Sequence, residues 1–377
     1  MKDKKRYYFD WAASAEPCSS LNIPQPCGNP SSQHSEGRKA KQALEDARAR
    51  CAAVLNVPAQ TVYFTSGGTE SNCIALYSNL FRKGEGRVIY PQTEHPSITE
   101  NIKNLKKMVR PIAGIEVDSS GRGTPALLED ALEKNQDVRF AAIMAVNNET
   151  GAVTDMTALR DVVRKKQTPR IHLHCDMVQA VGKVPVDISL WDIDSASISA
   201  HKIGGPRGIG ILYLRRPFEA IYRGGGQESN QRPGTENVYG ALALAACLES
   251  RAGDTLDKEF KNASLRWKRL TDALKKTDRC VLVPQDRDEN SFSPYILQTA
   301  FRGVPGEVMA RALDDLGFAV STGSACSSSA TERPVLAAMG VDETTSLESI
   351  RISQGWTTTD EEIDLLIIAI NEVLNFL

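Results

Sequence analysis

The chain has 377 residues, of which 41% are hydrophobic and 24% are charged, and its formal net charge is -2. This composition is ordinary for a globular protein with two domains or one large one, and it offers no basic stripe that would bind nucleic acid. No apolar run is long enough to span a bilayer and no signal peptide is recognisable, so we expect a cytoplasmic protein without a membrane partner.

The residues from about 61 to 214 alternate between strand-like and helix-like segments. Apolar, β-branched runs predict the strands, and helical spacing or an N-cap residue predicts the helices between them. In chain order, we expect strands at 61–64, 87–90, 138–146, 171–175 and 193–198, and helices at 69–81, 97–108, 125–134 and 156–166. This α/β alternation predicts a large domain, placed at 11–248, with a mostly parallel sheet covered by helices.

The pattern changes after about residue 240. One helix is expected to run through Leu248, and the later elements are a helix at 260–274 and strands at 280–283, 295–301 and 350–353. Thr359 and Glu362 form a capping box in front of a last apolar helix. We therefore predict a smaller α+β domain built from residues 1–10 and 249–377.

Small or polar residues follow the predicted strands of the large domain. In parallel sheets, ligands bind beyond the carboxyl ends of the strands, which lie at one edge. We therefore expect one ligand site that is formed by Ser66–Gly68, His95, Asn148, Asp176 and Lys202.

The run Ser66-Gly67-Gly68-Thr69 joins a predicted strand to a helix N-terminus. Glycines let backbone N–H groups approach a ligand closely, and the N-terminal end of a helix attracts anions. Gly68 and Thr69 are therefore candidates for holding a phosphate. The run has neither the dinucleotide-binding nor the P-loop glycine spacing, so an ordinary turn capped by Thr69 remains the alternative.

Lys202 follows the strand predicted at 193–198 and precedes a glycine-rich turn. An amine at a strand end suits Schiff-base chemistry, although most loop lysines are simply solvated. Asp176 ends another strand and can pair with a pyridinium nitrogen, while Gln179 can bond a ring oxygen. With the anion site, and with His95 to stack on a ring, these groups are what pyridoxal 5'-phosphate requires.

A metal site is the competing interpretation of the same strand. Strand alternation puts His172, His174 and Asp176 on one face. We expect no metal there, because no further ligand cluster accompanies them. The eight cysteines are scattered without a CxxC pair, which also argues against a zinc ribbon or a redox dithiol.

Cys326 differs from the other cysteines in its surroundings. It lies in a run of small and polar residues, 321–331, that contains no large apolar side chain. We therefore expect an exposed thiol, and an accessible thiolate can act as a nucleophile. An incidental surface cysteine is the alternative.

The chain resembles the pyridoxal-phosphate-dependent cysteine desulfurases of iron–sulfur cluster assembly, within the class V aminotransferase group. The resemblance rests on an ordered set of motifs over nearly the whole chain rather than on any single one. The matching stretches are FDWAA (9–13), GNPSSQH (28–34), TSGGTESN (65–72), TEH (93–95), NNETG (147–151), DMVQAVGK (176–183), HK (201–202), GGGQE (224–228), RPGTEN (232–237), SAC (324–326) and RIS (351–353).

The resemblance implies the pyridoxal-phosphate fold of type I and a role for each candidate residue. Lys202, Cys326 and His95 would be catalytic, and Asn148 and Arg351 would bind the substrate carboxylate. The implied cofactor-binding residues are Gly68, Thr69, His95, Asn148, Asp176, Gln179, Ser199, His201 and Lys202, with Thr235 reaching the phosphate in a neighbouring subunit of a homodimer.

The implied reaction converts L-cysteine to L-alanine and leaves sulfur as a persulfide on Cys326, for transfer to an acceptor or scaffold protein. A selenocysteine lyase or another class V enzyme is the nearest alternative, and a non-catalytic sulfur-transfer scaffold is a further one. The segment 18–27 is shorter than is usual in the family. Gly68, Gly204 and Pro233 stand where Ala, Tyr and Ser are common, but none of these changes removes a catalytic group.

Overall fold

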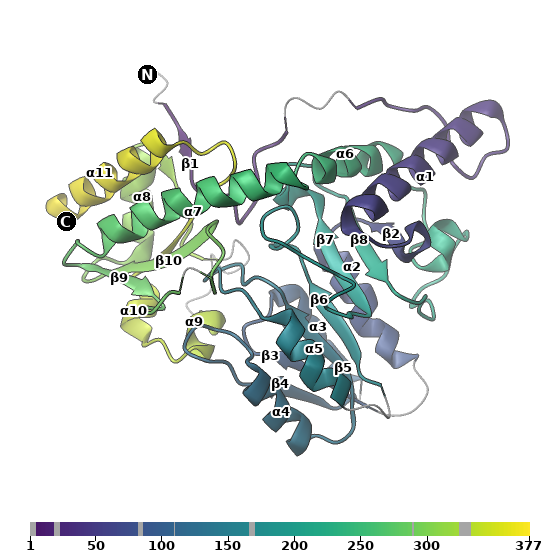
Figure 1. Ribbon diagram of the computed structural model, residues 1–377, viewed down its shortest axis with the longest axis horizontal. Coiled ribbons are helices and arrows are strands. Elements are labelled where there is room, and N and C mark those ends of the chain that lie inside the picture. Colours follow the sequence, from purple (N-terminus) through teal and green to yellow (C-terminus); the bar gives the residue numbers. More distant parts are fainter. Residues whose placement is uncertain are drawn as a thin grey trace.

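The computed structural model describes residues 5–18, 23–81, 86–108, 110–165, 170–288, 290–323 and 333–377. Two sheets dominate this structure, and helices pack around each of them (Figure 1). Within the described ranges, no helix is both long enough and apolar enough to cross a membrane.

The larger sheet has seven strands in the order β2-β8-β7-β6-β5-β3-β4. Only β8 runs against the direction of the others, because it pairs antiparallel with both β2 and β7. The expected mostly parallel sheet is thus confirmed. The strands are β2 (Val62–Thr65), β3 (Arg87–Pro91), β4 (Ile112–Ile115), β5 (Val138–Met144), β6 (His172–Asp176), β7 (Ser195–Ser199) and β8 (Gly210–Leu214).

Helices cover both faces of this sheet, as expected. One face packs against α1 (Ser35–Leu55), α4 (Pro125–Lys134), α5 (Met156–Lys165) and α6 (Val238–Glu249). The other face packs against α2 (Gly68–Tyr77) and α3 (Pro96–Lys107). Short 3-10 turns lie at η1 (Ala59–Thr61), η2 (Ser78–Leu80), η3 (Ala200–Lys202) and η4 (Gln227–Asn230).

The smaller sheet is antiparallel, in the order β12-β10-β9, and all three of its strands were expected from the sequence. They are β9 (Cys280–Val283), β10 (Ile296–Phe301) and β12 (Ser349–Ser353). A separate apolar core joins this sheet to α7 (Asp254–Leu274), α8 (Gly306–Asp315) and α11 (Asp360–Phe376). Two short helices, α9 (Pro334–Ala338) and α10 (Glu343–Leu347), complete this part. The domain boundaries 11–248 and 249–377 stay a prediction.

Residues 5–18 connect the two parts of the molecule. β1 (Tyr7–Tyr8) pairs in parallel with β11 (Phe318–Ala319), and Phe9 is buried in the core around the smaller sheet. The chain then runs to the larger sheet, where Ala15 N–H donates to His201 O at 2.9 Å. The first described segment therefore reaches the residues beside Lys202.

Candidate active site

A cavity of about 230 Å³ lies at the carboxyl ends of the parallel strands. The structure brings most of the candidate residues together there. The lining includes Gly68, Thr69, His95, Asn148, Asp176, Gln179, Ser199, His201, Lys202 and Arg351. Of the other expected site residues, Thr235 is exposed and does not line this cavity, and Cys326 lies outside the described residues.

The junction between β2 and α2 forms a cradle of backbone groups. Gly67 is the N-cap of α2 with φ 149°, a conformation that favours glycine. A Cβ on Gly68 would lie 2.5 Å from Val178 Cγ2, so a larger residue would crowd the cavity wall. Because Gly67 offers no capping side chain, the first N–H groups of α2 are left to an anion.

Asp176 is held in place by a residue that the sequence analysis did not single out. Asn72 Nδ2 donates to Asp176 Oδ2 at 2.7 Å, and the N–H of Val178 donates to Oδ1 at 3.0 Å. Asn72 lies three residues after Thr69, about one turn further along α2 and on the same side of the helix. This spacing is the sequence signal by which Asn72 could have been found. The carboxylate of Asp176 is therefore fixed on the cavity floor.

The two histidines of β6 are engaged in hydrogen bonds behind Asp176. His174 Nε2 lies 2.9 Å from Asn72 Oδ1, and its Nδ1 lies 2.7 Å from Ser195 Oγ. His172 Nε2 lies 2.8 Å from the same Ser195 oxygen. Burial lowers the pKa of His174 to about 3, so its imidazole is neutral. These contacts join both imidazoles to polar protein partners.

His95 is the N-cap of α3, and that position fixes its tautomer. The N–H of Ser97 donates to His95 Nδ1 at 3.0 Å, so Nδ1 is an acceptor and the ring proton is on Nε2. Burial lowers the pKa of His95; nearby Asp176 opposes this effect and Lys202 adds to it. The site therefore holds a neutral ring with an Nε2–H.

Lys202 ends η3, directly after β7. Its Nζ donates to the carbonyls of Ala12 at 2.6 Å and Ala13 at 2.9 Å. Beside it, burial lowers the pKa of His201 to about 4, and the positive charge of Lys202 adds to the effect. Residues 12–13 thus hold the amine over the cavity.

Gln179 is held by a second lysine that the sequence analysis did not assign. Gln179 Nε2 donates to Ala12 O at 2.8 Å, while Gln179 Oε1 accepts from Lys183 Nζ at 2.7 Å. Lys183 is 2% exposed. Burial lowers its pKa well below the ordinary value, and the charges of Lys202 and Arg351 contribute.

Arg351, from β12, brings the smaller sheet into the site. Its guanidinium donates to Asp10 Oδ1 at 2.8 Å and to Asn148 O at 3.0 Å. Two buried polar atoms here have no protein partner, namely the donor Arg351 Nε and the acceptor Asn148 Oδ1. Buried polar atoms are normally paired, so this pair is suited to a ligand with a carboxylate and a donor group.

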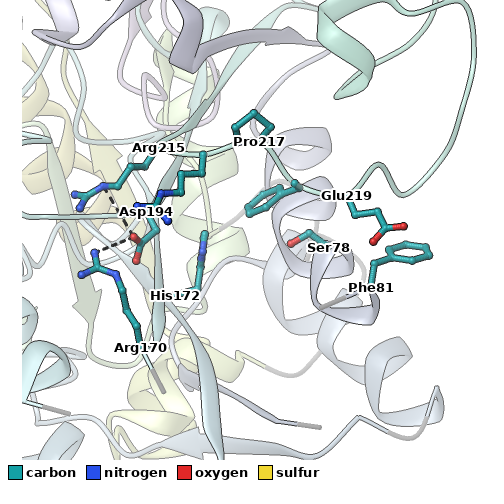
Figure 2. Close-up of a pocket in the computed structure, with 10 residues that line it drawn as sticks. Ser78, Phe81, Arg170, His172, Asp194, Arg215, Pro217 and Glu219 are labelled. Atoms are coloured by element: carbon teal, nitrogen blue, oxygen red, sulfur yellow. Dashed lines mark hydrogen bonds and ion pairs between the residues drawn. The ribbon is translucent and has the colours of Figure 1, made fainter. Parts of the chain in front are cut away.

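A second cavity, of about 460 Å³, lies at the opposite ends of the same strands. His172 begins β6 and lines this second cavity, whereas Asp176 ends β6 and lines the first. In Figure 2, Arg170 and Arg215 point toward Asp194 from two sides, and Arg170 lies 3.0 Å from its Oδ1. Asp192 pairs with the same two arginines, so two carboxylates compensate these two cations. We therefore assign the chemistry to the smaller cavity despite its size.

The residues of the smaller cavity fit pyridoxal phosphate. The uncapped helix N-terminus suits a phosphate, the carboxylate of Asp176 suits a pyridinium nitrogen, and the amine of Lys202 suits an aldehyde carbon. Arg351 Nε and Asn148 Oδ1 have no protein partner and remain open to a further ligand.

Comparisons with known proteins agree with this geometry. The profile described as "Aminotransferase class-V" matches residues 21–366. The chain is 35% identical to a "NifS/IcsS protein homolog" of Lactobacillus delbrueckii, over 92% of this chain and 90% of that protein. It is also 35% identical to the "Cysteine desulfurase IscS" of Vibrio vulnificus, over 90% of this chain and 83% of that protein.

Solved structures show the same fold over nearly the whole chain. A structure called "NIFS-LIKE PROTEIN" superposes with a TM-score of 0.90 and 31% identity, over 99% of this chain and 100% of that one. A NifS-like protein from Rickettsia africae superposes with a TM-score of 0.86 and 27% identity, over 98% of this chain and 99% of that one.

Proposed function

The chain belongs to the class V aminotransferase family, and from that membership we propose that it is a pyridoxal-phosphate-dependent cysteine desulfurase. The observation that carries the proposal is the convergence of the Lys202 amine, the Asp176 carboxylate, the glycine cradle and Arg351 in one cavity. The net reaction turns L-cysteine and the Cys326 thiol into L-alanine and a Cys326 persulfide. One S–S bond forms as the substrate C–S bond breaks, so no external oxidant is needed.

Bound pyridoxal phosphate supplies an electron sink for the substrate carbons. Its phosphate would be held by the N–H groups at the start of α2, with Thr69, Ser199 and His201 around it. Asp176, fixed by Asn72, would face the ring nitrogen, and His95 would cover one ring face.

The substrate would be oriented by Arg351 and Asn148. Asp10 and the backbone of Asn148 engage the terminal nitrogens of the guanidinium and leave Nε for a carboxylate oxygen. A guanidinium that is already held in place loses little freedom on binding, so it orients the substrate at low entropic cost.

Lys202 would carry protons at the substrate α-carbon. The carbonyls of Ala12 and Ala13 accept hydrogen bonds from its Nζ and so hold the amine in place. His95 can exchange a proton only at Nε2, because the N–H of Ser97 engages Nδ1.

Cys326 would be the nucleophile that takes the sulfur, and a soluble acceptor or scaffold protein would receive it. A thiol has a reference pKa of about 8.5, so activity should rise with pH unless the site stabilises the thiolate. We also propose a cytoplasmic homodimer in which the exposed Thr235 of each copy contacts the phosphate bound by the other.

The decisive experiment adds L-cysteine and pyridoxal phosphate to the purified protein and measures alanine and sulfide. The wild type should show a visible absorption band and release alanine. Lys202→Ala should abolish turnover. Cys326→Ser should keep the fold and the band but form no persulfide, as judged by mass spectrometry. Alanine release by Cys326→Ser at the wild-type rate would remove the nucleophile from the proposal.

A further inference from the structure

β2 is an edge strand of the larger sheet, and it leads directly into the glycine cradle. Its inner side pairs with β8, whereas side chains satisfy its outer side. Arg48, from α1, donates to Val62 O at 2.7 Å, and the N–H of Phe64 donates to Glu228 Oε2 at 2.7 Å. An ion pair therefore takes the place that a neighbouring strand would occupy.

The Arg48–Glu228 pair is bidentate and nearly buried. Its two N–O distances are both 2.7 Å, and the side chains are 10% and 2% exposed. Glu45 accepts from Arg48 Nε at 3.1 Å and from Arg48 Nη2 at 3.3 Å. With Val62 O, these contacts use all five N–H groups of the guanidinium, an arrangement that lysine cannot reproduce.

Glu228 begins a strained stretch of backbone. Glu228, Ser229 and Asn230 have φ angles of 46°, 51° and 65°, so three successive residues other than glycine are left-handed. Left-handed backbone is unfavourable for residues other than glycine, and a run of such residues persists only where surrounding contacts hold it. The buried carboxylate of Glu228 is such a contact, at the first residue of the run.

A second attachment fixes the same segment to the other side of the cradle. Arg232 Nε donates to Glu70 Oε1 at 3.2 Å, and Tyr222 OH donates to the same oxygen at 3.2 Å. Glu70 lies in the first turn of α2, next to Thr69. The segment 224–237 is thus tied both to β2 and to α2, while Thr235 within it is exposed and does not line its own cavity.

We propose that Arg48 and Glu228 are positioning residues, whose ion pair holds the segment 224–237 so that Thr235 reaches the phosphate site of a second copy of this chain. The inference rests on the proposed homodimeric function. It explains why a strained, polar and exposed segment is fastened by a buried ion pair at the junction that forms the cradle.

The first test measures the dissociation constant of pyridoxal phosphate by equilibrium dialysis. Glu228→Gln should weaken binding by about tenfold or more, while the dimer mass and far-ultraviolet circular dichroism stay unchanged. Arg48→Lys keeps the charge but loses the planar guanidinium. Its dissociation constant should lie between those of the wild type and Glu228→Gln, and it serves as the test variant if Glu228→Gln fails to fold. The matched control is Glu249→Gln, which removes an exposed ion pair to Arg50 on α1, the helix that also carries Arg48; this variant should bind the cofactor like the wild type.

The second test asks in which copy Glu228 acts. Mixed dimers of Lys202→Ala and Glu228→Gln, isolated with two affinity tags, contain one site with both Lys202 and an intact partner segment. At saturating cofactor concentration, these dimers should bind about half as much cofactor as the wild type, and they should show about half of its activity. Mixed dimers no better than Glu228→Gln, or a Glu228→Gln variant with wild-type affinity, would overturn the inference. A wild type that neither binds the cofactor nor releases alanine would instead overturn the proposed function.

Discussion

Lys183 shows how one buried side chain can set the state of a site without lining it. Its amine has a hydrogen bond to Gln179 Oε1, and two cationic residues, Lys202 and Arg351, lower its pKa further after burial. Burial and these two charges therefore disfavour the protonated form of the amine. That amine orients the amide of Gln179, so the Nε2 of Gln179 faces Ala12 O.

We expect Lys183 to make the folding stability depend on pH. The unfolded lysine keeps its proton up to a pH of about 10.4, whereas the folded one releases it at a much lower pH. The unfolded state therefore binds the extra proton, and the free energy of unfolding rises with pH in that window, by up to about 1.4 kcal/mol per pH unit. Urea unfolding of Lys183→Met between pH 7.5 and 9.5 should lack this slope. Parallel slopes for the variant and the wild type would show a protonated lysine.

At the scale of single elements, the packing at the start of α2 depends on Gly68, its first residue. Gly68 lies against Val178, which follows β6, and the two positions share the space beside the anion cradle. The glycine at position 68 therefore leaves room for the side chain of Val178.

Gly68→Ala should therefore disturb the cradle unless Val178 shrinks as well. The added methyl would lie 2.5 Å from Val178 Cγ2, and overpacking of this kind costs about 1–3 kcal/mol. We expect Gly68→Ala to weaken pyridoxal-phosphate binding and Gly68→Ala/Val178→Ala to restore most of it. Equilibrium dialysis of the two single variants and the double variant measures this coupling. Additive effects in the double variant would contradict it.

Local signals predicted some elements to the residue, whereas others depend on distant contacts. The N-cap Thr124 and the capping box at Thr359 were recognisable because a few neighbouring side chains define them. α1 was missed, since its buried face carries small residues such as Ala40 and Ala47 among charges. The antiparallel direction of β8 and the link from Asn72 to Asp176 arise from contacts that no local pattern encodes.

At the scale of the whole molecule, Arg287 is a tie between the two sheets. It lies between β9 and β10, and it donates to Thr150 O at 2.9 Å in the loop after β5. It also donates to Val283 O at 3.1 Å and lies 4.0 Å from the ring centre of Phe292. The tie therefore ends two residues from Asn148, in the same loop of the site.

Arg287→Met should destabilise the protein by about 3 kcal/mol, because it leaves several carbonyls without a charged donor. The control is Arg269→Met, which removes an exposed ion pair to Asp364 and should change stability by about 0.5 kcal/mol or less. Urea unfolding followed by tryptophan fluorescence measures both. Equal, small effects of the two substitutions would mean that Arg287 does not hold the sheets together.

The path of residues 5–18 has a consequence for how the protein folds during its synthesis on the ribosome. The carbonyls that accept from Lys202 belong to a segment that is synthesised early, yet Ala12 N–H donates to Ser353 Oγ, 341 residues later. β1 likewise cannot pair until β11 has been synthesised. Translation must therefore be almost finished before the early segment finds its place, even if the larger sheet has already folded. A ribosome stalled before Ser349 would carry a folded sheet with an incomplete site, so chemistry would begin only near chain release.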